Sequence, residues 1–184
     1  RQETDFLRGY AAGFGAQPNR ETNKEGFGAE LSNQLLSTKE TGVWNVNSHM
    51  MGETIPKETN LVSLDQEKTD AWGIPLLNID VDYDDNDEKM IQDFYEQFSE
   101  MYEKSGFVNI KTNDNGRRPG NDIHEMGGVR MGKDPKTSLL NAWNQMHECK
   151  NVFVTDGACM TSTSTQNPSL TFMAITARAA NYAI

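Results

Sequence analysis

The sequence of 184 residues has few cysteines, little positive charge and no long apolar run. Two cysteines, Cys149 and Cys159, are too few for a disulfide framework, and we expect both to be ordinary buried thiols. The net charge of −10 leaves no positive field that would attract nucleic acid. Because no apolar run approaches the roughly 20 residues that a membrane-spanning helix needs, we expect a soluble protein, cytoplasmic or periplasmic.

Common ligand-binding motifs are missing as well. The G-x-G-x-x-G spacing of a dinucleotide-binding loop does not occur in the chain. The acidic stretch that starts at Asp80 resembles an EF-hand loop, but Asp85 stands where glycine is needed and Ile91 where glutamate is needed. His147 and Cys149 are the one short pair of histidine and cysteine, fewer than a zinc site requires. We therefore predict no bound metal.

Short strands joined by long loops are predicted for residues 6–60, which are rich in glycine, asparagine and threonine. A short helix is possible at residues 29–37, and the strand pattern continues at residues 60–64. Further along, Leu77, Ile79, Val81 and Tyr83 alternate with polar residues, which is the period of a half-buried strand. We expect this strand to run to about Tyr83.

An amphipathic helix follows. Asp85, Asn86 and Asp87 supply side chains that start helices. Apolar residues then recur at helical spacing until Gly106 ends the pattern: Met90, Ile91, Phe94, Phe98, Met101 and Tyr102. With neither internal repeats nor a linker, the chain is predicted to be one α+β unit.

The end of the chain combines a strand, a turn and a helix. The sequence NVFVT predicts a short strand that ends at the turn Asp156–Gly157. Asn167 is expected to cap a helix that starts at Pro168 and is buried almost all round. Such a helix start carries partial positive charge and can stabilise an anion.

The stretch HEMGGVRMG, residues 124–132, surrounds His124 with glycines and methionines. Glycine weakens regular structure and is useful where the backbone turns sharply or lies close to another group. His124 and Asn167 could each be purely structural when considered alone. Together, with the Asp156–Gly157 turn between them, they favour a site where a ligand binds at the end of a strand.

These residues resemble the carboxyl-terminal portion of the glucose-methanol-choline (GMC) oxidoreductases. HEMGGVRMG is similar to the family's histidine, glycine and R-M-G signature. KNVFVTDGACM is similar to its strand followed by Asp-Gly, and QNPSLTFMAITARAANYAI to its Asn-Pro and terminal helix. Glu53 lies in a segment that also resembles one near the family's active site, and we assign it no catalytic role.

The resemblance implies a mostly antiparallel sheet of a substrate-binding domain flanked by helices, at residues 1–123. Residues 124–184 would supply the active-site loop and the last strand and helix that complete an FAD-binding domain. The chain begins without an initiator methionine, so we expect a fragment of a longer protein whose amino-terminal FAD-binding portion is its partner. The fragment alone should be inactive.

The activity that the resemblance implies is oxidation of an alcohol or sugar CH–OH group, with hydride transfer to flavin N5. His124 would accept the hydroxyl proton and Asn167 would hold the substrate oxygen. Asp156, Gly157, Asn167 and the helix start at Pro168 and Ser169 would contact FAD. Arg130 is expected to brace the loop. The alternative is a non-catalytic binding or structural domain on the same scaffold.

Overall fold

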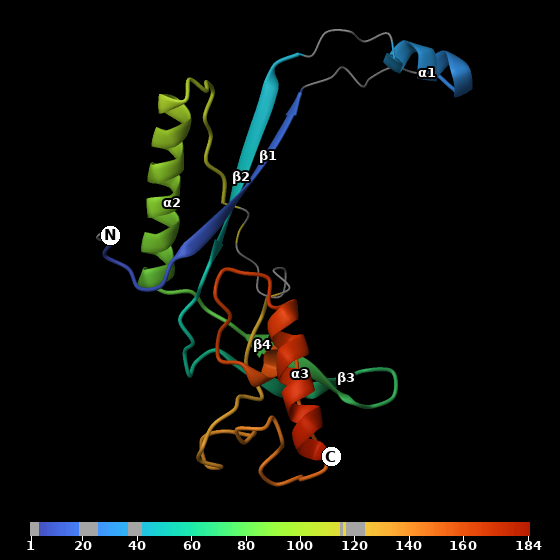
Figure 1. Cartoon of the computed structure of the whole chain (residues 1–184), viewed down its shortest axis with the longest axis vertical. Helices are drawn as coiled ribbons and strands as arrows, with labels where there is room; N and C mark the ends of the chain where they lie inside the picture. Colours follow the sequence, from blue (N-terminus) through green and yellow to red (C-terminus); the bar gives the residue numbers. More distant parts are fainter. Residues whose placement is uncertain (1–3, 19–25, 37–41, 115, 117–123) are drawn as a thin grey trace. The chain divides into compact units, whose positions relative to one another are not determined.

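The computed structural model describes residues 4–18, 26–36, 42–114, 116 and 124–184. The described chain contains both helices and strands, and the strands form two separate two-stranded sheets, which confirms the predicted α+β class (Figure 1). Along the chain the elements are β1 (Tyr10–Pro18), α1 (Gly28–Leu36), β2 (Trp44–Gly52), β3 (Leu61–Thr69), β4 (Pro75–Asp80), α2 (Asp85–Lys104), the 3-10 helix η1 (Gly157–Cys159) and α3 (Ser169–Ala183).

The chain forms two compact units. Unit 1 comprises Arg1–Tyr10 and Gly52–Ile184, and unit 2 comprises Ala11–Met51. Within unit 2, β1 pairs with β2, and Gly13 leaves the space that the His49 ring occupies. The short helix predicted at residues 29–37 is present as α1. The predicted boundary between residues 123 and 124 concerns domains of a longer protein and stays a prediction.

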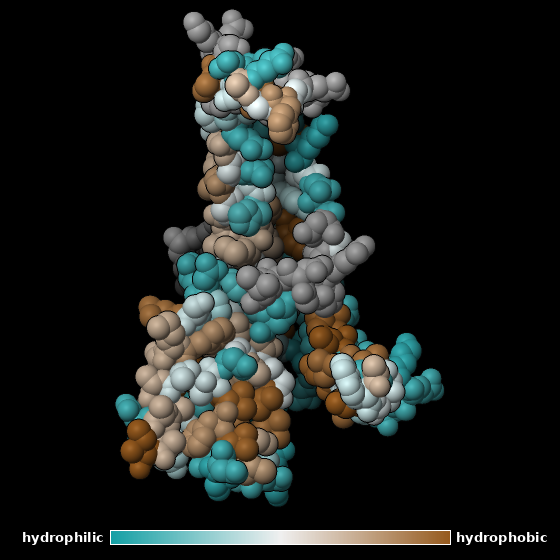
Figure 2. Space-filling view, turned by 90° about the vertical axis from the view of Figure 1, so that its right-hand side faces the viewer, coloured by the Kyte–Doolittle hydropathy of each residue, from teal (hydrophilic) through white to brown (hydrophobic). Residues whose placement is uncertain are grey.

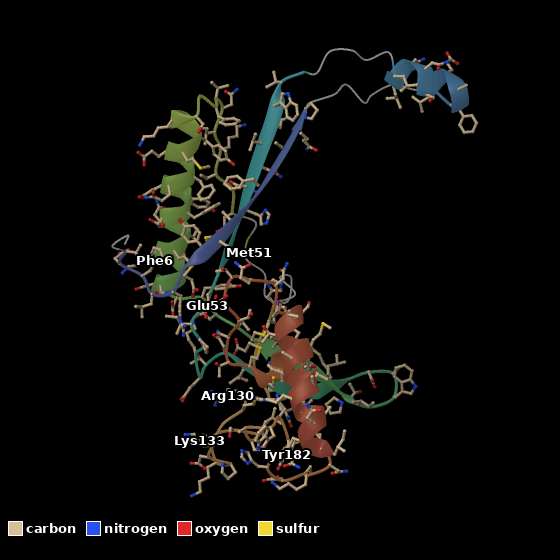
Figure 3. The ribbon with its side chains drawn as sticks, viewed as in Figure 1. Phe6, Met51, Glu53, Arg130, Lys133 and Tyr182 are labelled. Carbon is tan, nitrogen blue, oxygen red and sulfur yellow. The ribbon has the colours of Figure 1, made fainter. Side chains whose placement is uncertain are left out.

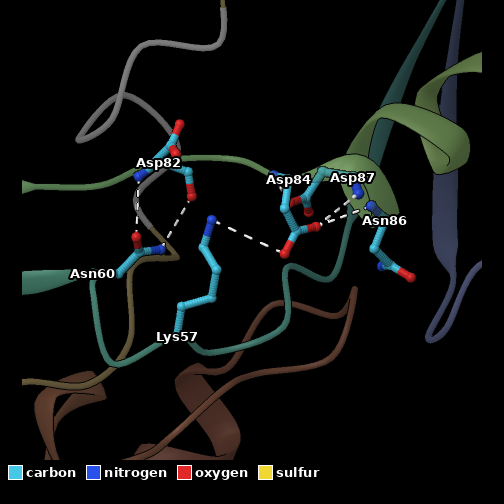
Figure 4. A network of polar contacts seen from close by, with 6 residues as sticks. All are labelled: Lys57, Asn60, Asp82, Asp84, Asn86 and Asp87. Atoms are coloured by element: carbon cyan, nitrogen blue, oxygen red, sulfur yellow. Dashed lines mark hydrogen bonds and ion pairs between the residues drawn. The ribbon is translucent and has the colours of Figure 1, made fainter.

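In unit 1, β3 and β4 form an antiparallel hairpin in which Leu61 faces Asp80. The predicted strand was expected to reach Tyr83, but β4 ends at Asp80. The Asn60 side chain explains the earlier end, because it donates to the Asp82 carbonyl at 3.3 Å and accepts from the Asp82 N–H at 3.1 Å (Figure 4). A side chain thus replaces the strand partner that Asp82 would need to continue the pairing.

Helix α2 begins with a capping box at Asp84 (Figure 4). Its carboxylate accepts from the N–H groups of Asn86 at 3.0 Å and Asp87 at 3.4 Å, and Asp87 accepts from the Asp84 N–H at 3.0 Å. Lys57 lies 4.0 Å from the same Asp84 carboxylate. Burial raises the pKa of Asp87, which is 6% exposed. The cap therefore precedes the predicted residues 85–87 by one position.

The remainder of α2 follows its apolar period. Met90 and Phe94 are buried, and Tyr10 packs edge-on against Phe94 with ring centroids 5.7 Å apart. The Tyr10 hydroxyl donates to Asp93 at 2.7 Å, which anchors Tyr10 to α2 within unit 1. The helix ends at Lys104, and Gly106 has a φ of 83°, as the sequence predicted for the end of this helix.

Helix α3 differs from the prediction in its burial. It was expected to be buried almost all round, but Ala179 is its one buried residue, while Leu170 is 77% and Met173 68% exposed. No described segment covers these two side chains. The lower half of Figure 2, where α3, β3 and β4 lie in Figure 1, accordingly shows large apolar areas.

The two cysteines differ in burial. Cys159 is a buried free thiol as predicted, but Cys149 is exposed, because it lies in a surface turn closed by the bond from the Val152 N–H to the Cys149 carbonyl. In the described ranges, no helix has the length and apolarity to cross a membrane.

Candidate active site

The loop at residues 124–132 is shaped by two consecutive glycines. Gly127 and Gly128 have φ values of 97° and 92°, in the left-handed region that favours glycine. Beyond Gly128 the space is open, since an added Cβ would meet no atom within 4 Å. His124 stands just before this turn and is half-buried. The prediction that the glycines serve a backbone conformation is therefore correct.

This loop lies along η1. The N–H groups of Gly127, Val129 and Met131 donate to the carbonyls of Gly157, Ala158 and Cys159 at 3.1, 3.0 and 3.1 Å. The donors are every second residue of the loop, whereas the acceptors are three consecutive residues of η1, so this contact is not a strand pairing. The three hydrogen bonds hold the HEMGGVRMG motif and the DGACM motif side by side.

Gly157 is the point at which three segments meet. A Cβ atom at this residue would lie 3.0 Å from the Glu125 carbonyl oxygen, 3.0 Å from the Met126 sulfur and 3.4 Å from Phe172 of α3. Only a glycine gives these neighbours room without a shift. The structure thus brings together the segments that carry His124, Asp156 and the terminal helix.

Asp156 caps η1, because its exposed carboxylate accepts from the Ala158 N–H at 3.0 Å. The strand predicted just before it is wrong in extent. Phe153 forms a single bridge with Gln145, and the rest of NVFVT has no strand pairing in the described structure. A strand needs a neighbour along its whole length to satisfy its N–H and C=O groups, and residues 144–146 provide that neighbour at one position.

The start of α3 corrects another prediction. The helix begins at Ser169, Pro168 occupies the capping position, and Asn167 is not the cap. Proline has no side-chain acceptor, so the first turn is held by the bond from the Phe172 N–H to the Pro168 carbonyl at 3.0 Å. Pro168 is buried, whereas Asn167 and Ser169 are exposed. The Asn167 amide is therefore available to a ligand at the positive end of the helix.

Behind the site, Arg178 of α3 holds the segment that leads to Asp156. Its guanidinium donates to the Ala142 carbonyl at 2.8 Å and to the Asn144 side-chain oxygen at 3.0 Å. Asn144 is fully buried and donates in turn to the Val154 carbonyl at 3.0 Å. Burial raises the pKa of the Cys159 thiol, and this effect outweighs a hydrogen bond from Asn144 that lowers it. Cys159 is thus a packed thiol rather than a nucleophile.

Sequence reasoning missed this support. Arg178 is the one charged residue of α3, and a single charge in an apolar helix was a signal that could have found it. Buried Asn144 carried no such signal. Arg130 was placed correctly as a brace, since it donates to the Thr137 carbonyl at 3.2 Å. Over the described residues, no group of three or more histidine, cysteine or acidic side chains could hold a metal ion.

Glu53 provides a second support for the site that was not predicted. Its carboxylate accepts from the Ser162 hydroxyl at 3.0 Å, which joins residues 109 positions apart. Ser162 lies in the irregular segment that leads from η1 to Asn167. The residues around the candidate site are therefore fixed from both α3 and the amino-terminal part of unit 1.

Comparison with known proteins gives a consistent family. A family model described as GMC oxidoreductase matches residues 56–176. The chain is 32% identical to 2-methyl-1,2-propanediol dehydrogenase of Mycolicibacterium austroafricanum, with 97% of the chain and 34% of that protein covered. It is 27% identical to the fructose dehydrogenase large subunit of Gluconobacter japonicus, with 98% and 34% covered. It is 31% identical to paromamine 6'-oxidase of Streptomyces fradiae, with 68% and 23% covered. The chain spans about a third of the length of the first two relatives.

Proposed function

The chain belongs to the GMC oxidoreductase family, and on this basis we propose that it is part of an FAD-dependent enzyme that oxidises a CH–OH group of an alcohol or sugar. The observation that carries the proposal is the crossing at Gly157, which joins the segments bearing His124, Asp156 and α3. The names of the relatives, two dehydrogenases and an oxidase, agree with an oxidoreductase.

The described residues fit a flavin in accessibility and charge. FAD, when bound, supplies flavin N5 as the acceptor of the substrate hydride. Asp156 and Gly157 would lie against the ribityl or pyrophosphate part, and the exposed carboxylate would accept from ribityl hydroxyl groups. Asn167, Pro168 and Ser169 would lie against the flavin, since the start of the 15-residue helix α3 favours negative charge.

His124 is the proposed base. An imidazole can accept a proton near neutral pH, and a base positioned at the substrate hydroxyl accelerates its removal. The Gly127–Gly128 turn and the hydrogen bonds to η1 fix the backbone beside His124. The loop would thereby hold the imidazole at the substrate.

Asn167 is proposed to orient the substrate. Its exposed amide can donate to the substrate oxygen, and it is not used as the helix cap. Charge that develops on that oxygen would lie close to the N–H groups of the first turn of α3, where it is stabilised. In this proposal His124 removes the hydroxyl proton, and Asn167 binds the substrate oxygen.

The partner of this chain is proposed to be an amino-terminal FAD-binding portion of the same protein. The relatives are about three times as long as this chain. Leu170 and Met173 on α3 are 77% and 68% exposed. A segment that covered these apolar side chains would remove them from water, which is favourable. We expect the amino-terminal portion to supply half of the flavin site, so the chain alone should not oxidise alcohols, and turnover by the isolated chain with added FAD would contradict this.

The decisive experiment is anaerobic reduction of the full-length protein by candidate alcohols and sugars, followed in the flavin absorption bands. We expect bands that bleach, and a loss of at least roughly a hundredfold in the reduction rate in His124→Ala. His147→Ala is the matched control, because this histidine bonds with Ser138 at 3.2 Å and is not assigned to the site. A colourless protein would support the alternative, a non-catalytic domain on this scaffold. Reduction at an unchanged rate in His124→Ala would refute the assigned base.

A further inference from the structure

Glu53 is a nearly buried carboxylate with partners from two other segments of unit 1. Its side chain is 13% exposed and lies 3.6 Å from the Arg8 guanidinium. It accepts from the Ser162 hydroxyl at 3.0 Å, and its own N–H donates to the Gly9 carbonyl at 3.1 Å. Figure 3 shows Glu53 in unit 1, close to the segment that precedes α3. A carboxylate in such a position is stable only when its oxygens have partners.

Glu53 lies at the point where the chain re-enters unit 1. The chain leaves unit 1 after Tyr10 and returns at Gly52, so Gly9 and Glu53 stand at the exit and the re-entry. The hydrogen bond from the Glu53 N–H to the Gly9 carbonyl joins the two points at which the chain leaves and re-enters unit 1. Arg8 is half-exposed, so its ion pair with Glu53 is screened by water and contributes little fixed geometry. The stronger constraint is the hydrogen bond to Ser162, which lies in a partly buried environment.

Residues 161–167 depend on this constraint. They form no helix or strand, and they carry Asn167 at their end. Among the described residues, we find no second hydrogen bond that ties positions 161–167 to another segment. Chain segments with few hydrogen bonds open locally at low free-energy cost. The Ser162 bond therefore governs how well the position of Asn167 is defined.

We propose that Glu53 is a positioning residue, which holds residues 161–167 through the Ser162 hydroxyl and thereby fixes Asn167 against the substrate. The role for Asn167 rests on the proposed function, whereas the order of the loop does not. Glu53 itself transfers no proton in this proposal. Its oxygen is needed as a hydrogen-bond acceptor, so a neutral amide at the same position should serve almost as well.

The first test is hydrogen–deuterium exchange of residues 161–167 in the full-length protein. We expect Glu53→Ala and Ser162→Ala each to raise the exchange rate roughly twofold to tenfold, the value of one hydrogen bond. The double variant should exchange no faster than the faster single variant, because both changes remove the same bond. Glu53→Gln should stay close to the unchanged protein. Thr161→Ala removes an exposed hydroxyl from the same segment and is the matched control.

Unchanged exchange in both single variants, or effects that multiply in the double variant, would overturn the proposal. Exchange in Glu53→Gln as fast as in Glu53→Ala would show that the charge, not the hydrogen bond, orders the loop, and would overturn it too. These measurements require neither flavin nor substrate. Loss of the proposed function, seen as a protein without flavin, is therefore distinguished from loss of this inference.

A second readout tests the consequence for Asn167. In the flavin-containing protein, Glu53→Ala and Ser162→Ala should slow anaerobic flavin reduction by the same factor, roughly tenfold, and the double variant by no more. A merely structural role would lower resistance to unfolding and leave the reduction rate of the folded protein unchanged. Faster loop exchange with an unchanged reduction rate would thus refute the link to Asn167.

Discussion

Substitution of Gly157 by alanine tests the crossing on which the candidate active site depends. The new Cβ would lie 3.0 Å from the Glu125 carbonyl oxygen and 3.0 Å from the Met126 sulfur. The methionine side chain can turn away, but the carbonyl belongs to a backbone held by the bond from the Gly127 N–H to the Gly157 carbonyl. The two loops must therefore move apart by a few tenths of an ångström.

The expected magnitude combines two opposing effects. Overpacking by one methyl group costs about 1–3 kcal/mol. Alanine also restricts the unfolded chain, which returns about 0.4–1 kcal/mol where the backbone conformation suits it. The net loss in the free energy of unfolding should be about 1–2 kcal/mol. Because the shift displaces the segment that carries His124, flavin reduction should also slow, by roughly tenfold.

Urea-induced unfolding followed by tryptophan fluorescence is the suitable assay. Trp143 stacks on Tyr182 of α3 at 4.9 Å and reports on this region. Gly9→Ala is the matched control, since an added Cβ at Gly9 meets nothing within 4 Å and should leave stability unchanged or slightly raised. If Gly157→Ala unfolded at the same urea concentration as Gly9→Ala, the close crossing at residue 157 would be wrong.

Two further substitutions concern the supports of unit 1. Burial raises the pKa of Asp87 in the folded protein. The stability that its protonation contributes is therefore fully present below the unfolded pKa and is lost as the pH rises through the folded pKa. Asp87→Asn should therefore gain stability relative to the unchanged protein between pH 4 and pH 7 in urea titrations, and an offset equal at both values would contradict this. Arg178→Met leaves the buried Asn144 oxygen without its donor and should cost about 1–3 kcal/mol in the same assay. Equal stability of this variant would mean that Asn144 finds another partner.

The parts of the fold that the sequence predicted are those set by local forces. Helix α2 follows from an apolar period and from acidic caps, which act within a few residues. Gly127 and Gly128 follow from a backbone conformation that other residues avoid. In both cases the residues that determine the structure are neighbours in the chain, so no knowledge of the remaining structure was needed.

Burial of α3 and pairing of residues 151–155 were predicted incorrectly because they depend on partners. An apolar composition indicates that a segment is stable when it is buried. It does not indicate whether the segment that buries it belongs to the same stretch of sequence. Leu170 and Met173 have the composition of buried helix residues and are exposed among the described residues. On the proposed function, the missing cover is the amino-terminal portion, so the same composition that misled the prediction supports the proposed partner.

In the candidate site, local motifs predicted the proposed functional residues but not the distant residues that support them. His124, Asp156 and Asn167 stand in motifs whose glycines and proline constrain the backbone locally, and so they could be proposed from sequence. Glu53 acts on Ser162 across 109 residues, and an isolated glutamate in the sequence has no feature that identifies such a partner. Since the precision of a catalytic group depends on its supports, loss of the Glu53 acceptor in Glu53→Ala should slow the reaction, although Glu53 itself transfers no proton.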